Sequence, residues 1–176
     1  MANVGGPYTG NEGSPIAMSA AASSDPEGGA LTYSWDFGDG TTATGATVAK
    51  TYANSRTYTV TLAVTDGAGA SSTASSTVAV ADVPPTATFV APTGIRVGAT
   101  FTLSLTNAFD VSPKDHASGY AYGFDCGQGW FGAWTASSSV SCPAVWWAGT
   151  RTVRARVRDR WDYAHREYRK TISVIW

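Results

Sequence analysis

Apolar and polar side chains alternate with a period of two residues along most of this chain. Between residues 58 and 65, four apolar side chains alternate with threonine or alanine, and between residues 152 and 158 valine and alanine alternate with threonine and arginine. Such alternation is typical of antiparallel β-strands that bury one face. Similar short runs, separated by clusters of Gly, Pro, Asp and Asn, predict further strands at residues 15–20, 31–37, 46–51, 72–80, 86–90, 99–105, 119–125, 138–145 and 165–175. No segment has helical periodicity, so the sequence predicts an all-β protein.

The chain also contains an internal repeat. Residues 31–40 match residues 120–129, and residues 56–66 match residues 149–159 in the same order. A Pro-Pro pair lies between the two copies, as in a short, stiff linker. We therefore expect two domains, residues 1–83 and 84–176. Each holds about seven short strands, the number that an immunoglobulin-like β-sandwich contains.

Residues 35–40 read Trp-Asp-Phe-Gly-Asp-Gly, which resembles the signature of polycystic-kidney-disease (PKD) domains. The similarity extends to Gly6-Pro7-Tyr8, to residues 23–28 and to residues 58–67, and so covers nearly all of residues 3–82. The resemblance implies two tandem PKD-type β-sandwiches, which are regarded as non-catalytic. The second copy departs from the signature, because Phe124, Cys126 and Gln128 replace its tryptophan, phenylalanine and second aspartate.

The signature also has a purely structural explanation. Trp35 and Phe37 lie on the same face of a strand, where a tryptophan commonly fills the space between two sheets. Gly38 and Gly40 supply the positive φ angles of a tight turn. The sequence contains two histidines and no nucleophile elbow, phosphate loop or pair of metal-binding histidines, so we predict no enzyme. It has no run of about 20 apolar residues, so we expect no membrane insertion.

Composition favours an extracellular protein. Charged residues are only 14% of the chain, against about 25% in an average soluble protein, and the strands are rich in threonine and serine. In a secreted or cell-surface protein, Cys126 and Cys142 are expected to form a disulfide. Two reduced thiols in the core are the alternative.

Charge is distributed unevenly between the two halves. Residues 1–83 carry two basic and seven acidic residues, whereas residues 84–176 carry ten basic and six acidic ones. Opposite net charges allow head-to-tail self-association, or an acidic partner for the second domain. Nucleic acid is not a predicted partner, because the whole chain has a net charge of −1 and no lysine-rich patch.

Calcium is the one cofactor that the resemblance implies. Some PKD domains bind it through an N-terminal asparagine and aspartates in two loops, which correspond here to Asn3, Asp25 and Asp66. The matching loops of the second copy contain Asp110 and Asp159. Calcium takes six to eight oxygen ligands, which such loops can supply. The alternative is that these aspartates cap turns.

Arginine and tryptophan are concentrated in the second half. Four arginines alternate at positions 154, 156, 158 and 160, and six of the seven tryptophans lie there: Trp130, Trp134, Trp146, Trp147, Trp161 and Trp176. In one interpretation, indole or tyrosine rings from neighbouring strands lie between the guanidinium groups as a ladder, assisted by Glu167 and Asp162. In the other, a binding face for sugar, acidic polymer or protein is formed by Arg154, Arg156, Arg158, Trp130, Trp134, Trp146 and Trp147.

Together these features predict a non-catalytic extracellular spacer or adhesion module of a larger secreted or surface protein, with protein or polysaccharide contacts. Two alternatives stay open. One is a carbohydrate-binding accessory module of a secreted hydrolase, and the other is a subunit that self-assembles into a surface layer or filament.

Overall fold

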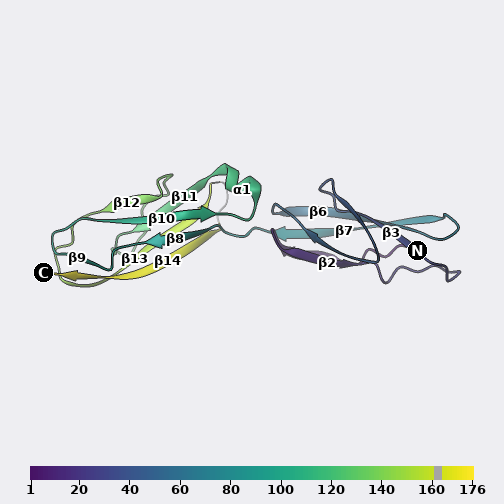
Figure 1. The fold of residues 1–176 in the computed structure, drawn as a ribbon, viewed down its shortest axis with the longest axis horizontal. Helices are drawn as coiled ribbons and strands as arrows, with labels where there is room; N and C mark the ends of the chain where they lie inside the picture. Colours follow the sequence, from purple (N-terminus) through teal and green to yellow (C-terminus); the bar gives the residue numbers. More distant parts are fainter. Residues whose placement is uncertain (161–163) are drawn as a thin grey trace. The chain divides into compact units, whose positions relative to one another are not determined.

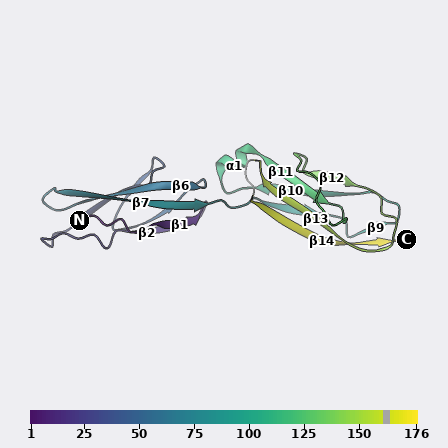
Figure 2. The same ribbon diagram turned by 180° about the vertical axis from the view of Figure 1, so that it is seen from behind.

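The computed structural model describes residues 1–160 and 164–176. Its contacts divide the chain into two compact units, Met1–Val83 and Pro84–Trp176. Both units consist almost entirely of β-strands (Figures 1 and 2), which confirms the all-β prediction. Trp161 and Asp162, the latter expected to assist the arginine row, lie outside the described residues.

The first unit is a sandwich of two sheets. Its larger sheet has five strands, in the order β1 (Tyr8–Asn11), β7 (Ser71–Ala81), β6 (Arg56–Thr65), β3 (Thr32–Asp36) and β4 (Thr42–Thr44). Its smaller sheet pairs β2 (Pro15–Ser19) with β5 (Thr47–Thr51). The alternating apolar residues of both sheets meet in one core, so the period-two pattern accounts for the packing.

Trp35 lies at the centre of this core and is fully buried. Its indole Nε1 donates a hydrogen bond to the carbonyl oxygen of Gly45 at 2.9 Å, which satisfies the one polar atom that the ring takes into the core. Gly38 and Gly40 follow with φ angles of 71° and 85°, as the turn requires. The predicted structural role of this motif is therefore confirmed.

The second unit is also built from two sheets. One has four strands, in the order β11 (Tyr120–Asp125), β13 (Gly149–Asp159), β14 (His165–Ile175) and β9 (Gly94–Arg96). The other has three, in the order β12 (Ser139–Cys142), β10 (Phe101–Phe109) and β8 (Thr86–Val90). Buried side chains of both sheets form a single core that includes Leu103, Phe124 and Val157.

The pairing register repeats between the units. In the first, Trp35 of β3 lies opposite Leu62 of β6; in the second, Phe124 of β11 lies opposite Ala155 of β13. These are the same pairs that the sequence repeat aligns. In each unit a short strand also runs parallel to the last long strand, β1 beside β7 and β9 beside β14. The four strands β1, β7, β6 and β3 thus have counterparts in the same order in the second unit, whereas β4 has none among the described residues.

One short helix was not predicted. Helix α1 (Pro113–Ser118) begins after Ser112, whose hydroxyl accepts a hydrogen bond from the backbone N–H of Asp115 at 3.3 Å. Six residues are too few for a helical period to appear in the sequence, and the Ser-Pro start was the available signal. Strands β1, β4 and β9 were also missed, because three or four residues are too few to show an alternation. None of the helices in the described residues has the length and hydropathy of a membrane span.

A disulfide joins Cys126 to Cys142 across a sequence separation of 16 residues. Cys126 directly follows β11 of one sheet, and the buried Cys142 ends β12 of the other. The bond therefore links the two sheets of the second unit, and the predicted pairing is confirmed.

Replacing both cysteines by alanine should lower the unfolding free energy of the second unit by about 3 kcal/mol, because the unfolded chain regains the freedom of a loop of this length. Hydrogen exchange followed by mass spectrometry measures each unit through its own peptides. Peptides of the first unit, which contains no cysteine, serve as the internal control. Unchanged protection in the second unit would contradict the prediction.

Candidate functional site

Three arginines of β13 form a ladder with two aromatic rings. Arg154, Arg156 and Arg158 alternate with buried residues and so share the outer face of the strand. The guanidinium carbons of Arg154 and Arg156 lie 4.6 and 4.3 Å from the ring centroid of Phe131. Those of Arg156 and Arg158 lie 4.2 and 4.5 Å from the ring centroid of Trp134. Each ring thus stands between two cations, an arrangement that offsets their mutual repulsion.

The rings of this arginine ladder come from an unexpected place. They belong to the segment 126–138 between β11 and β12, not to neighbouring strands, and one of them is a phenylalanine rather than a tyrosine or tryptophan. The expectation of rings from adjacent strands is therefore wrong. A strand's alternation shows where its side chains point, whereas it carries no information on which loop covers them.

Arg156 is the central cation of the ladder. Burial lowers the pKa of its guanidinium, the charge of Glu167 acts in the opposite direction, and the charges of Arg158 and Arg154 lower the pKa further. Glu167 lies opposite Arg156 on β14. The attraction of the rings and of this carboxylate for the guanidinium groups offsets the repulsion among three like charges on one face of the strand. In turn the arginines fix the segment 126–138 against the sheet.

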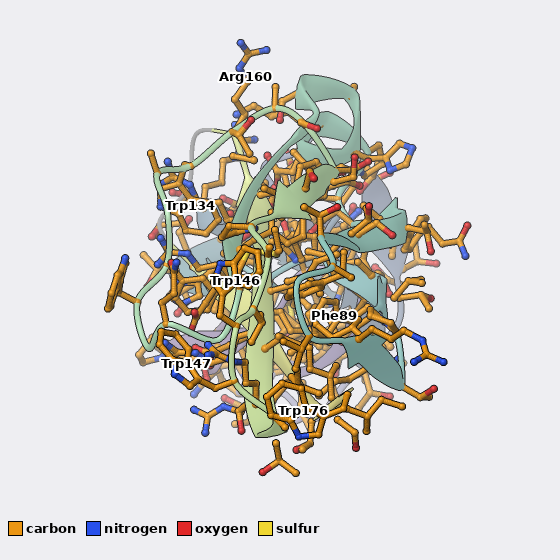
Figure 3. All side chains as sticks on the ribbon, turned by 90° about the vertical axis from the view of Figure 1, so that its left-hand side faces the viewer. Phe89, Trp134, Trp146, Trp147, Arg160 and Trp176 are labelled. Atoms are coloured by element: carbon orange, nitrogen blue, oxygen red, sulfur yellow. A yellow bond between two sulfur atoms is a disulfide. The ribbon has the colours of Figure 1, made fainter. Side chains whose placement is uncertain are left out.

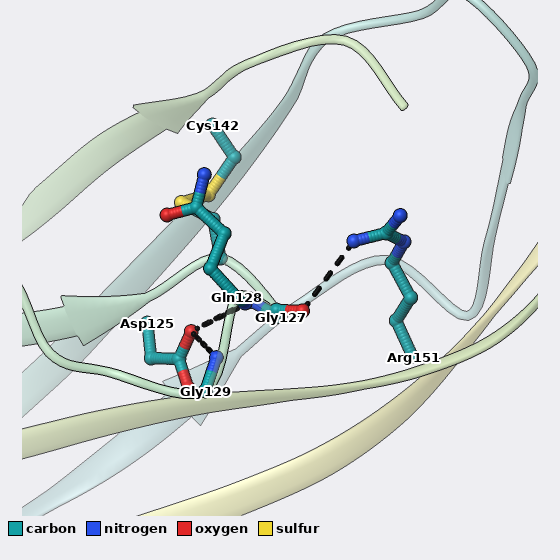
Figure 4. Close-up of a disulfide and its surroundings, with 7 residues drawn as sticks. Asp125, Gly127, Gln128, Gly129, Cys142 and Arg151 are labelled. Atoms are coloured by element: carbon teal, nitrogen blue, oxygen red, sulfur yellow. Dashed lines mark hydrogen bonds between the residues drawn. A yellow bond between two sulfur atoms is a disulfide. The ribbon is translucent and has the colours of Figure 1, made fainter. Parts of the chain in front are cut away.

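A second anchor holds the start of that segment. The Oδ1 atom of Asp125 accepts hydrogen bonds from the backbone N–H groups of Gly127, Gln128 and Gly129 at 2.9, 2.8 and 3.2 Å. Its Oδ2 atom accepts one from Nε of Arg154 at 2.9 Å. Burial alone would raise the pKa of Asp125, but these hydrogen bonds outweigh burial and hold it below its usual value. Asp125 therefore stays ionised and fixes the turn (Figure 4).

A cleft of about 650 Å³ opens beside this turn. It is formed by Asp125, residues 127–129, residues 147–152, Arg154 and Arg169, and we call it the turn cleft. Arg151 lies inside it, where Nη1 donates a long hydrogen bond of 3.4 Å to the carbonyl oxygen of Gly127 (Figure 4). Three guanidinium groups and one carboxylate line the cleft, so its net charge is positive.

At the corresponding corner of the first unit, polar side chains contact one another or the backbone. There Nζ of Lys50 lies 2.6 Å from the carboxylate of Asp39, and the hydroxyl of Tyr58 donates to the carbonyl oxygen of Asn54 at 2.8 Å. The repeat places neutral Gln128 where the first unit has Asp39, and Arg151 where it has Tyr58. The cleft thus arises from substitutions at positions that hold the first unit together.

The tryptophans proposed as a binding face differ in their surroundings. Trp130, Trp146 and Trp147 are 66%, 64% and 71% exposed, and the last two are labelled in Figure 3. Only Trp147 lines the turn cleft. Trp134 and Arg156 belong to the ladder instead. Of the predicted face, the structure brings Trp147 and Arg154 together in the cleft.

The first unit matches a known family. The family model described as PKD domain covers residues 1–80. These residues form one PKD domain. This match ends at residue 80, and the PKD character of the second unit is a proposal taken up below.

Curated relatives are bacterial proteases much longer than the matched region. The collagenase ColA of Bacillus cereus is 36% identical over 86 residues, which cover 49% of this chain and 9% of that protein. The microbial collagenase of Vibrio alginolyticus is 39% identical over 71 residues, covering 40% and 9%. The pre-pro-metalloprotease PrtV of Vibrio cholerae is 45% identical over 67 residues, covering 38% and 7%. The match therefore spans less than a tenth of each relative.

Solved structures add a likeness of fold. The insect immune protein hemolin, at 14% identity, covers 98% of this chain and 46% of its own, with a TM-score of 0.54. A PKD domain of an M14-like peptidase from a Thermoplasmatales archaeon is 21% identical and covers 55% of this chain and all of its own, with a TM-score of 0.42. The first likeness supports an all-β, immunoglobulin-like fold.

Within the PKD domain, two of the three residues expected to bind calcium lie together. Asp25 and Asp66 line one cavity of about 130 Å³, and Asn3 is not part of its lining. Both aspartates also cap turns. Asp25 accepts from the backbone N–H of Gly29 at 2.7 Å, and Asp66 accepts from that of Ala70 at 2.9 Å. The side-chain oxygen of Asn3 accepts from the N–H of Gly5.

The matching aspartates of the second unit are placed differently. Asp110 and Asp159 are 3% and 1% exposed. The Oδ1 atom of Asp110 accepts a hydrogen bond from the backbone N–H of Ser112 at 2.7 Å, just before helix α1. Asp159 ends β13, opposite Tyr120 of β11.

Sequence reasoning missed four residues that matter at the ladder and the cleft: Phe131, Asp125, Arg151 and Arg169. A signal existed for two of them. The repeat aligns Asp125 with Asp36 of the PKD signature. It also aligns Arg151 with Tyr58, so a basic residue replaces a core aromatic one. Arg169 becomes visible only once β13 and β14 are paired in register.

Arg156→Ala should destabilise the second unit by about 1 kcal/mol or more, because the variant loses packing against two rings along with the charge. Arg156→Lys should restore only part of the loss, since an ammonium group does not stack as a plane. Peptide-resolved hydrogen exchange is the measurement. Arg169→Ala is the control: its side chain is 70% exposed and, among the described residues, forms an ion pair with Glu167 alone, and such exposed pairs contribute little.

A double-mutant cycle between Arg156→Ala and Trp134→Ala tests whether the ring and the cation interact. We expect a coupling of roughly 0.5–1 kcal/mol. If the losses of stability in the two single variants simply add up in the double variant, the ring and the cation lie close together without stabilising each other.

Proposed function

We propose that this chain is a non-catalytic accessory module of a larger extracellular protein, and that its second unit attaches that protein to a polysaccharide or protein surface. The observation that carries the proposal is the turn cleft, which is lined by both an exposed indole, Trp147, and Arg151. Concave sites with an aromatic wall and a few fixed polar groups are typical ligand sites.

The groups of the cleft suit binding rather than catalysis. Its one carboxylate, Asp125, has both oxygens engaged in hydrogen bonds, and its pKa is held below the usual value. A general acid or base at neutral pH needs a pKa near 7. The remaining polar and aromatic side chains of the lining are arginine, glutamine, threonine and indole groups, which can bind and orient a ligand.

We further propose that the second unit is a divergent PKD-type domain. Its strand order and the register of β11 on β13 repeat those of the PKD domain, as described above. An extracellular location is supported by the Cys126–Cys142 disulfide, a bond that persists in oxidising compartments. The names of the relatives, two collagenases and a pre-pro-metalloprotease, agree with a module carried beside a secreted hydrolase.

Retention of the full chain on insoluble polysaccharides and on collagen fibrils tests this function. Trp147→Ala should abolish retention on whichever of these materials retains the parent protein, because the substitution removes the indole from the wall of the cleft. Trp176→Ala is the matched control, since this ring is 81% exposed but lies outside the cleft.

Retention that survives Trp147→Ala, or that is absent on every material, would contradict the proposal. Sedimentation at low salt covers the remaining alternative. Concentration-dependent assembly of the chain with itself, driven by the opposite charges of its halves, would point to a structural subunit instead.

We also propose that the PKD domain binds calcium at the cavity shared by Asp25 and Asp66. Neither carboxylate forms an ion pair with a described residue, and two like charges in one cavity favour a bound cation. The ammonium group of Met1 lines the same cavity and donates to the carbonyl oxygen of Ser24. The donor set of carboxylate and carbonyl oxygens suits calcium.

Millimolar calcium, the range in which extracellular modules bind it, should raise the stability of the PKD domain in the full chain by mass action. Asp66→Asn should remove the effect while keeping the turn, because the amide oxygen still accepts the backbone hydrogen bonds. Glu27→Gln removes a nearby exposed carboxylate outside the cavity and serves as control. An absence of stabilisation would leave both aspartates as turn caps.

A further inference from the structure

The proposed function leaves open which ligand the turn cleft recognises, and the charges of the cleft narrow the choice. We propose, on the basis of that function, that the cleft binds an anionic polysaccharide, with the sugar's carboxylate or sulfate held by Arg151 and Arg169 and a pyranose ring packed on Trp147. All three side chains line the same cleft.

Arg151 is the cation that the fold itself does not require. It occupies the position where the PKD domain has Tyr58, whose hydroxyl closes the corner. Its one hydrogen bond in the structure is the 3.4 Å contact to the carbonyl of Gly127, and it forms no ion pair with residues 1–160 or 164–176. A half-buried guanidinium with free donors is well suited to a bidentate anion.

Arg169 and Arg154 differ in their availability. Arg154 is bound by the carboxylate of Asp125, so its charge is already balanced within the cleft. Arg169 is 70% exposed and contacts Glu167, whose Oε1 atom also lies 3.6 Å from Nη1 of Arg154. Asp125 and Glu167 together balance two of the three guanidinium groups, so one net positive charge remains in the cleft, on Arg151, while the exposed Arg169 can exchange its contact with Glu167 for one with a ligand.

The cleft is held in place before any ligand arrives. Asp125 fixes the turn through three backbone hydrogen bonds, and the disulfide ties the next residue, Cys126, to β12 (Figure 4). The arginine ladder holds the following segment against β13. A site fixed in this way loses little conformational entropy on binding, which favours affinity for an extended polymer.

The lining favours a sugar over an acidic peptide. Trp147 offers a flat apolar face of the kind that packs on the C–H face of a pyranose, and Gln128 offers both a donor and an acceptor for hydroxyl groups. A peptide bound in an extended form needs pockets for alternate side chains. Apart from Trp147, the only apolar side chain of the lining is Ala148.

Binding of the full chain to soluble polymers tests the proposal. Polygalacturonate presents carboxylates and dextran sulfate presents sulfates, and the two arms together identify the anionic group. Neutral dextran and polyglutamate serve as the uncharged and the peptide comparisons. We expect at least one anionic polysaccharide to bind about tenfold or more tightly than either comparison, with an affinity that falls as salt is added.

Arg151→Gln and Arg169→Gln should each weaken this binding by about tenfold, as expected for the loss of a charge-assisted hydrogen bond. Arg166→Gln, an exposed arginine on the same strand as Arg169 but outside the cleft, is the control and should bind as the parent does. Because Arg169 is exposed, its variant keeps the test valid even if Arg151→Gln disturbs the fold.

The outcomes separate this inference from the function on which it rests. Trp147-dependent binding to neutral polysaccharides alone would overturn the anionic ligand and leave the accessory function intact. Equal binding of polyglutamate would point to an acidic protein and overturn the inference. An equal loss of binding in Arg166→Gln would show that the polymer is attracted by the overall positive charge and not by the cleft, and would overturn the inference. Absence of any Trp147-dependent binding would contradict both proposals.

Discussion

The second unit depends on how three like charges are accommodated along one strand. β13 places Val153, Ala155 and Val157 in the core, so Arg154, Arg156 and Arg158 must share the opposite face. The repulsion among them is relieved by rings from a distant segment, and that segment is consequently fixed to the sheet. The turn that precedes this segment, the disulfide and the cleft all lie near the point where the attached segment begins.

The two units show how one scaffold can be closed or open at the same corner. In the PKD domain, Asp39, Lys50 and Tyr58 satisfy one another or the backbone and leave little for a ligand. In the second unit, Gln128 and Arg151 take two of those places without reproducing the contacts. The strands keep their order and register in both. The difference in chemistry is therefore confined to side chains at one end of the sandwich, where loops and strand ends meet.

Alternation and repetition made most of the strands predictable, because a strand with one buried face records its register in the sequence. Positions that the repeat aligns also occupy the same places in the register, because Phe124 lies opposite Ala155 as Trp35 lies opposite Leu62. Contacts between a loop and a sheet leave no such record. Phe131 and Trp134 were therefore not recognisable as the partners of the arginines, although the need for partners was clear from the charges.

The cleft was less predictable still, since it is a space produced by residues from β11, β13 and β14 together. The only sequence signal for the cleft was that the repeat has Arg151 at the position where the first copy has Tyr58. Helix α1 and the short strands β1, β4 and β9 escaped notice because three to six residues are too few to establish a period.

The segment 126–138 is rich in glycine, alanine and serine, the composition of a loop that proteases commonly cut. Cleavage requires a stretch of backbone to leave the surface and lie extended in the enzyme's groove. Here such a departure would have to separate both rings from three guanidinium groups while the disulfide still held one end. Local opening of this segment is therefore costly, and the second unit carries this long loop in a form that resists digestion.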